Sequence, residues 1–259
     1  MIIAQISDPH LGPPGARLFG GYDADAAFSA VLARVAGFDP RPDIVLLTGD
    51  LTENGTPEEY ANFNRLIAGF DLPMVAIPGN HDRRAAFAAA LAPTPIAIGS
   101  APWFHLCVEE WPLRLIGLDS LGGDGESRGV LCAERLDWLA ARFSESDRPV
   151  LLFLHHQPFA TGIPFVDANV CVNGDRLGEI VAGHPRIAGV LCGHVHRAVQ
   201  RAWAGTIGMI CPGVAWEVPL DLSPAGRPRL VPQNPGWQLH VWSPEGGLVS
   251  HTEYLPGFE

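Results

Sequence analysis

Five short apolar runs in this chain each lead into a cluster of chemically reactive side chains. The runs MIIAQIS, DIVLLT, PMVAIP, VLLFL and IAGVLC have the length and composition of buried β-strands. The motifs that follow them are Asp8-Pro9-His10, Gly49-Asp50, Gly79-Asn80-His81-Asp82, His155-His156 and Gly193-His194-Val195-His196. Parallel strands present their C-terminal ends at one sheet edge, so we expect the motifs to converge there. Aspartate, asparagine and histidine are ligands for a pair of borderline divalent metals.

The first ninety or so residues alternate predicted strands with predicted helices. Strands are expected over 2–7, 43–48 and 73–77, with helices over 24–36, from 57 onward and up to about 91. The second helix has a clear start, because Thr56 is a good N-cap, Pro57 suits the first turn and Glu59 completes a capping box. This order predicts a layered parallel sheet with right-handed crossovers.

The rest of the chain adds a second set of strands. Strands are predicted within 103–109 and 113–119, at 150–154, in the run before Gly193, and at 199–203, 206–211, 237–242 and 247–254; helices are predicted at 132–143 and 175–183. We predict an α/β fold, a four-layer αββα sandwich of two mixed β-sheets flanked by helices, in one domain over 1–259. The hairpins in 198–259 are expected to complete the second sheet. Segment 159–175 is expected to form a cap over the site or a subunit contact.

Composition narrows the classes of partner. The formal net charge is −11 and the chain has no basic run, which argues against a nucleic-acid polymer or an anionic membrane as the main partner. No apolar stretch approaches the length of a membrane span. All 17 basic residues are arginine, which excludes Schiff-base chemistry and a phosphate-binding lysine.

The five cysteines are scattered, without the CxxC spacing of a metal or redox site. Such a pattern is typical of reduced thiols, with an intersubunit disulfide as the alternative. The N-terminal segment begins directly with a predicted strand and lacks the pattern of a signal peptide. We therefore expect a cytoplasmic protein.

Two pairs of neighbouring histidines are candidate metal ligands. Alternate residues of an extended segment share a face, so His194 and His196 are expected to point at one centre. Of the adjacent pair, we favour His155 as the metal ligand because it comes first after its strand. His156 then lines the pocket or supports its neighbour, and the reversed assignment is the alternative.

The ordered set D-x-H, G-D, G-N-H-D, H-H and G-H-x-H resembles the calcineurin-like metallophosphoesterase superfamily. The motifs span positions 8 to 196, about three quarters of the chain. Within the superfamily, the segments HHQPF and GHVHR are most similar to the class III cyclic-nucleotide phosphodiesterases and the related bacterial glycerophosphodiesterases. The resemblance implies the αββα fold, a dinuclear metal centre and hydrolysis of phosphodiesters.

The resemblance also implies a ligand set. One metal would be held by Asp8, His10 and His196, and the other by Asn80, His155 and His194, with Asp50 bridging the two. The cofactors would be two divalent ions among Mn, Fe, Zn and Co, about 3.5–4 Å apart, that activate a bridging hydroxide for in-line attack. Because Asn80 is neutral, we expect its metal to bind less tightly and to load with substrate.

Catalytic and substrate contacts are implied in the same way. His81 would stabilise charge on the phosphoryl group or protonate the departing alkoxide. Asp82 would orient the ring of His81, with a turn or cap role as the alternative. Substrate contacts are expected from Asn80, His81, His156 and Trp216. Trp216-Glu217 stands where related enzymes often carry His-Gln, so the resemblance does not define the substrate pocket.

We expect hydrolysis of small phosphodiesters, of the cyclic-nucleotide or glycerophosphodiester type. The alternatives are a phosphomonoesterase on the same scaffold and an inactive scaffold protein. Asp82 stands where protein phosphatases usually have glutamate, and an inactive scaffold should have lost ligands, whereas all seven expected ligands and His81 are present. The expected partners are a small-molecule substrate and further copies of the chain, as a homodimer or higher homo-oligomer.

Overall fold

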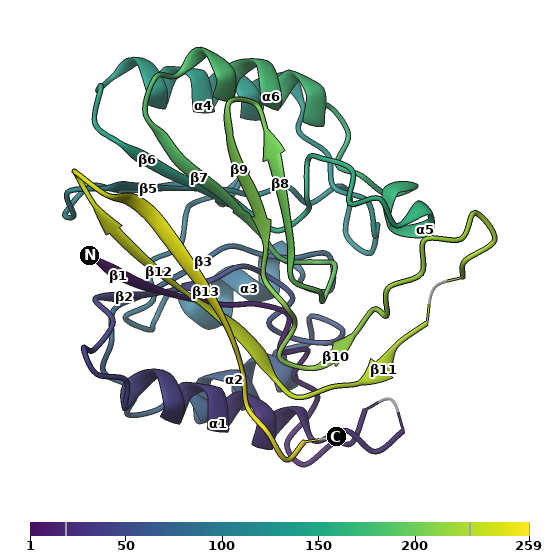
Figure 1. Ribbon diagram of the computed structural model, residues 1–259. Coiled ribbons are helices and arrows are strands. Elements are labelled where there is room, and N and C mark those ends of the chain that lie inside the picture. Colours follow the sequence, from purple (N-terminus) through teal and green to yellow (C-terminus); the bar gives the residue numbers. More distant parts are fainter. Residues whose placement is uncertain (19, 228, 259) are drawn as a thin grey trace.

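Two β-sheets pack face to face, and helices cover their outer faces (Figure 1). The computed structural model describes residues 1–18, 20–227 and 229–258. The first sheet has the strand order β13-β12-β1-β2-β3, and the second has the order β4-β5-β6-β7-β9-β8. The predicted αββα architecture is therefore confirmed.

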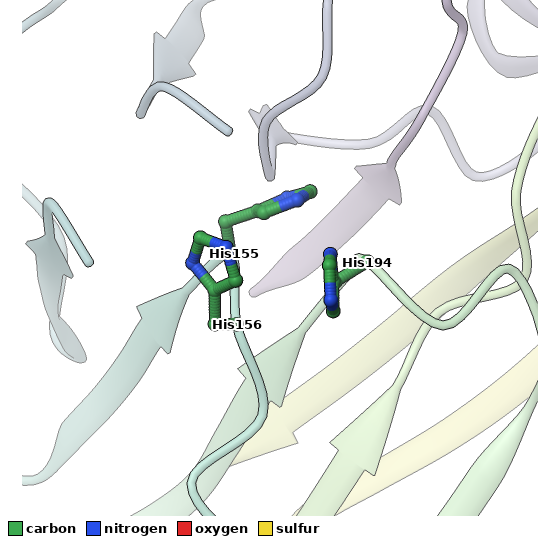
Figure 2. Close-up of side chains that lie close together, drawn as sticks. All are labelled: His155, His156 and His194. Atoms are coloured by element: carbon green, nitrogen blue, oxygen red, sulfur yellow. The ribbon is translucent and has the colours of Figure 1, made fainter. Parts of the chain in front are cut away.

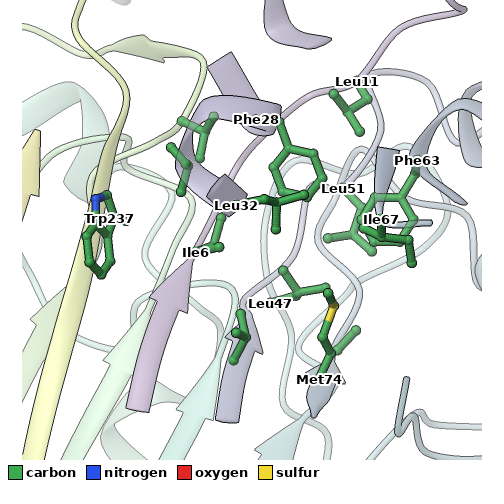
Figure 3. Packing of buried hydrophobic residues seen from close by; sticks show 14 of the residues in the cluster. Ile6, Leu11, Phe28, Leu32, Leu47, Leu51, Phe63, Ile67, Met74 and Trp237 are labelled. Atoms are coloured by element: carbon green, nitrogen blue, oxygen red, sulfur yellow. The ribbon is translucent and has the colours of Figure 1, made fainter. Parts of the chain in front are cut away.

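The parallel half of the first sheet is built from the first predicted repeats. Its strands are β1 (Ile2–Ile6), β2 (Ile44–Leu47) and β3 (Met74–Ala76), and its helices are α1 (Ala24–Ala36), α2 (Pro57–Leu66) and α3 (Arg84–Leu91). The capping box at the start of α2 is present, with the Thr56 side chain accepting from Glu59 N. Figure 3 shows apolar side chains of the strands and of α1, such as Ile6, Leu47 and Phe28, packed in one cluster.

The second sheet combines a parallel centre with antiparallel edges. Its strands are β4 (Leu106–Val108), β5 (Arg114–Leu118), β6 (Val150–Leu154), β7 (Ile187–Cys192), β8 (Val199–Trp203) and β9 (Thr206–Ile210). Helices α4 (Ala133–Ser144) and α6 (Gly174–Gly183) accompany it. Between the sheets lies a separate apolar cluster, to which Ile3 and Leu46 contribute from the first sheet and Leu151 and Phe153 from the second. This shared core fixes the two sheets against each other.

One expectation about the C-terminal region is wrong. Only the β8–β9 hairpin extends the second sheet; β12 (Gly236–Ser243) and β13 (Gly247–Tyr254) join the first, with β12 antiparallel to β1. The physical reason is that β1 has an open edge opposite β2, and Trp237 and Leu239 of β12 pack into the core under α1. Alternation predicts a hairpin, but it does not identify the sheet edge that accepts it.

Three short elements were not anticipated: α5 (Pro164–Asp167) and the strand pair β10 (Trp216–Glu217) and β11 (Val231–Pro232). They lie on the side of the molecule toward which β1, β6 and β7 run (Figure 1). Among the residues described, no helix has both the length and the apolar character that crossing a membrane requires.

Candidate metal centre

The five motifs meet where the C-terminal edges of the two sheets adjoin. Asp8, Asp50 and Asn80 follow β1, β2 and β3 of the first sheet, whereas His155 and His194 follow β6 and β7 of the second. Among the described residues, three groups of side chains that could hold a metal ion result. The first consists of Asp8, His10, Asp50 and His196, the second of His155, His156 and His194, and the third of His10, Glu53 and His81. The convergence expected from parallel strand ends is thus present, and it draws on both sheets.

The backbone of these motifs is strained. Among the described residues other than glycine, seven have positive φ, and five of them are candidate ligands: Asp8, His10, Asp50, His194 and His196. Left-handed backbone is costly for such residues and persists where surrounding structure enforces it, typically at functional sites. It also overturns the expectation about the last motif. Residues 193–197 are not extended, although His194 and His196 enter different groups, as in the ligand set that the resemblance implies.

Motif glycines permit the close approach of these segments. A Cβ on Gly79 would lie 2.3 Å from the backbone nitrogen of Asp50, and one on Gly193 would lie 2.8 Å from Oδ2 of Asp8. Gly49 has φ of +96°, and a Cβ there would lie 2.5 Å from Nδ1 of His155. The strand ends can converge only because these positions carry no side chain.

In the first group, two imidazoles converge on two carboxylates. Nε2 of His196 lies 3.3 Å from Oδ1 of Asp8, and Nε2 of His10 lies 3.5 Å from Oδ2 of Asp50. The two Nε2 atoms are 3.1 Å apart. Nδ1 of His10 donates to the Glu53 carboxylate and Nδ1 of His196 to the carbonyl of Trp216. Because both Nδ1 atoms are donors, the converging Nε2 atoms carry lone pairs, and a cation between them, a proton or a metal ion, is required.

The second group repeats this arrangement around His155. Its Nδ1 donates to the carbonyl of Thr48 at 2.8 Å, so Nε2 faces Oδ1 of Asn80 at 3.1 Å and Oδ2 of Asp50 at 3.3 Å. The same Asp50 oxygen therefore faces His10 in one group and His155 in the other. A carboxylate shared in this way suits a bridge between two ions, and the mixture of carboxylate, imidazole and amide oxygen fits divalent Mn, Fe, Co or Zn.

His155, His156 and His194 lie close together (Figure 2). The ring centroid of His194 lies 5.2 Å from that of His155 and 4.6 Å from that of His156. The hydroxyl of Ser120 lies 2.9 Å from Nδ1 of His156, whereas His155 alone of the pair faces Asn80 and Asp50. This geometry favours His155 as the ligand and His156 as a neighbour of the site.

The carboxylates and imidazoles of the site stabilise one another's charged forms. Burial alone would raise the pKa of Asp8, but His196 and His155 lower it to about 2. Burial opposes the ionised form of Asp50 as well, yet His155 and His10 hold its pKa well below the ordinary value. Burial alone would lower the pKa of His155, but Asp50 raises it to about 9. The two carboxylates are therefore ionised in the folded protein, as metal ligands must be.

The assignment of Asp82 is corrected. Its fully buried carboxylate accepts hydrogen bonds from the backbone nitrogens of Leu51 and Gly79 and from the hydroxyl of Tyr60, the last at 2.7 Å. It thereby joins the loops after β2 and β3, and the ring of His81 is held instead by the carbonyl of Glu53, 2.7 Å from Nδ1. The side chain of His81 is 36% exposed, so it stands at the surface of the site.

Glu53 is a site residue that the motifs did not identify. Its carboxylate lies 2.7 Å from Nδ1 of His10, and its carbonyl accepts from Nδ1 of His81. One residue therefore fixes the ring of a candidate ligand and the ring of the candidate catalytic histidine. The sequence feature that could have identified Glu53 is its position three residues after Asp50, between that motif and α2.

Replacing Glu53 tests this role. Glu53→Ala removes the carboxylate that sets the tautomer of His10, and we expect the affinity for Mn²⁺ to fall about 10- to 100-fold. Isothermal titration of metal-stripped protein measures the change, with Glu58→Ala in the first turn of α2 as the control. Unchanged affinity in Glu53→Ala would contradict the role.

Trp216 lies beneath the site rather than across its opening. Its side chain is 4% exposed, and its ring stacks on His196 at 14° and lies 4.6 Å from the ring of His10. This burial leaves little surface for a substrate. We therefore replace the expected substrate contact with packing against two candidate ligands.

The chain is similar to several known phosphoesterases. The family model for calcineurin-like phosphoesterases matches residues 1–198. The chain is 34% identical to a probable glycerophosphodiester phosphodiesterase, GpdQ, of Arcobacter nitrofigilis, over 100% of this chain and 95% of that protein. It is 33% identical to a probable cyclic nucleotide phosphodiesterase of Rhodopseudomonas palustris, over 88% of this chain and 83% of that protein. A dimetal phosphatase from Danio rerio has a similar fold, with a TM-score of 0.68, 13% identity and coverage of 93% and 92%.

Proposed function

Because this chain belongs to the calcineurin-like phosphoesterase family, we propose that it is a metal-dependent phosphodiesterase acting on small organic diesters. Glycerophosphodiesters and cyclic nucleotides are the two substrate classes to test, since the names of the similar proteins above refer to them. The observation that carries the proposal is the placement of Asp50 between His10 and His155, whose Nε2 atoms lie 3.5 and 3.3 Å from the same carboxylate oxygen, Oδ2.

The proposed cofactors are two divalent ions, one held by Asp8, His10 and His196 and one by Asn80, His155 and His194, with Asp50 shared. Bound there, such ions supply an activated water nucleophile and neutralise charge on phosphoryl oxygens. The carboxylates and imidazoles keep their donor atoms aimed inward through hydrogen bonds on their outer atoms, such as His155 to Thr48 and His196 to Trp216.

His81 is the proposed acid. Its Nδ1 donates to the carbonyl of Glu53, which leaves Nε2 as the atom available to a substrate. A proton on Nε2 can pass to the oxygen of the departing alcohol, and the same atom can donate a hydrogen bond to the phosphoryl group. The exposed position of His81 beside buried candidate ligands suits contact with a bound diester. Asn80 and His156 are the other proposed substrate contacts.

The experiment is hydrolysis by metal-stripped protein reloaded with Mn²⁺. We expect higher kcat/KM with bis(p-nitrophenyl) phosphate than with p-nitrophenyl phosphate. Comparison of 3′,5′-cAMP with glycerophosphodiesters then distinguishes the two substrate classes. Preference for the monoester would move the protein to the phosphatases of this family. Absence of turnover with both metals bound would indicate a scaffold protein.

We further propose a homodimer or higher homo-oligomer. The segment that joins β10 to β11 projects from the body near α5 (Figure 1), and it exposes Leu220, Leu222 and Leu230 by 40–61%. Burial of these leucines against another copy of the chain would remove apolar surface from water. Sedimentation equilibrium of the protein and of Leu222→Asp tests this contact.

A cytoplasmic location is also proposed. All five cysteines are free thiols, and the thiols of Cys171, Cys192 and Cys211 are buried. Unpaired buried thiols suit a reducing compartment.

A further inference from the structure

An ion pair joins the two halves of the sandwich beside the candidate metal centre. Arg84, the first residue of α3, donates from Nε and Nη2 to the Asp119 carboxylate at 2.7 and 2.8 Å. Asp119 directly follows β5, which runs parallel to β6 and so ends at the sheet edge from which His155 extends. The Asp119 side chain is completely buried and that of Arg84 is 17% exposed. The pair is therefore shielded from solvent and bidentate.

Further hydrogen bonds lock the loop that follows β5. Arg84 also donates to the carbonyls of Leu121 and Gly122, at 3.0 and 3.1 Å, and Asp119 Oδ1 accepts from Leu121 N at 2.9 Å. The guanidinium of Arg135 donates to the Asp119 and Leu121 carbonyls. The Arg84 guanidinium satisfies all of its acceptors together because its donors form a planar fork. A lysine ammonium does not provide that geometry.

This loop holds the segment that carries His155. Ser120 lies between Asp119 and Leu121, which both accept from Arg84. The hydroxyl of Ser120 accepts from His156 N at 3.1 Å and lies 2.9 Å from Nδ1 of that ring. His155 is the adjacent residue, and its Nε2 is 3.1 Å from Oδ1 of Asn80. The position of His155 thus depends on the loop that Asp119 begins.

Arg84, the other partner of the ion pair, is linked to the position of Asn80. Arg84 lies four residues after Asn80, and the intervening turn is rigid, because Nη1 of Arg83 donates to the carbonyls of Asn80, His81 and Asp82 at 3.1–3.3 Å. A shift at the start of α3 therefore moves Asn80 with it. The two partners of the ion pair are each tied to one of two facing candidate ligands.

We propose that Arg84 and Asp119 are positioning residues that fix the separation of Asn80 and His155 and so set the affinity of the metal held by these two side chains. The proposal rests on the proposed function, since it assumes a metal at that position. The guanidinium of Arg84 is already bound to Asp119 and two carbonyls, which suits a positioning role.

The test is Arg84→Lys, which keeps the charge but loses the fork. Mn²⁺ is titrated calorimetrically into metal-stripped protein, and two affinities are fitted. We expect one affinity to fall about 10-fold or more and the other to stay unchanged. Activity should require correspondingly more Mn²⁺ and recover when the ion is saturating.

Arg114→Lys is the matched control. Arg114 is the first residue of β5, at the end of that strand away from the site, and is completely buried against Glu109, 2.7 Å from Nε. We expect this variant to lower the Tm of the metal-free protein without changing either Mn²⁺ affinity.

Three results would overturn the proposal: two unchanged affinities in Arg84→Lys, equal losses at both sites, or the same selective loss in Arg114→Lys. If Arg84→Lys does not fold, Asp119→Asn is titrated by the same criteria. If the wild-type protein binds fewer than two ions, the proposed metal centre itself is refuted. Failure of the positioning proposal and failure of the proposed function are therefore distinguishable.

Discussion

Asp50→Ala should abolish metal binding at both positions and lower kcat/KM at least about 1,000-fold, which corresponds to roughly 4 kcal/mol of transition-state stabilisation. Asp50 Oδ2 lies 3.5 Å from Nε2 of His10 and 3.3 Å from Nε2 of His155, so one substitution removes the carboxylate from both groups. It also removes the acceptor for His81 N, 2.7 Å from Oδ1. Metal content after gel filtration and diester hydrolysis measure the two losses.

Asp71→Ala is the control for this variant, since Asp71 is an exposed aspartate paired with Arg41. It should keep metal content and activity. Full occupancy of one position in Asp50→Ala, with the other lost, would contradict a shared carboxylate and assign Asp50 to a single ion.

His81→Ala should retain both metals and lose about 100- to 10,000-fold in kcat, the range for a general acid or base. Among the described residues, the His81 side chain makes no hydrogen bond to Asp8, His10 or His155. The carbonyl of Glu53 holds its ring at the edge of the site. The loss should be largest for diesters with poor leaving groups, because these need a proton most. Rates for a series of aryl and alkyl diesters measure the dependence.

The control for His81→Ala is His251→Ala, an exposed histidine on β13, which should leave the rates unchanged. Equal losses for activated and unactivated esters would argue against proton donation and leave His81 with a charge-stabilising role. Loss of metal in His81→Ala would place it among the ligands.

Several expectations failed at points where contacts between distant segments decide the outcome. His194 and His196 were expected on one face because alternation holds in extended backbone, but both residues adopt positive φ and the segment is not extended. Asp82 was expected at the ring of His81, and it binds Tyr60 and the loop after β2 instead. A motif gives residue types and spacing, whereas hydrogen-bond partners depend on which loops the fold brings together.

The sequence by itself determined the longer strands, their succession along the chain and the residue types at their ends. These are local properties, because apolar runs of strand length, helix caps such as Thr56 and the glycines Gly49, Gly79 and Gly193 act within a few residues. Only the tertiary structure decided which sheet the β12–β13 hairpin joins, that Asp50 faces both His10 and His155, that Glu53 binds His10 and that Arg84 pairs with Asp119. These features depend on burial and on contacts between segments far apart in the chain, which local pattern does not encode.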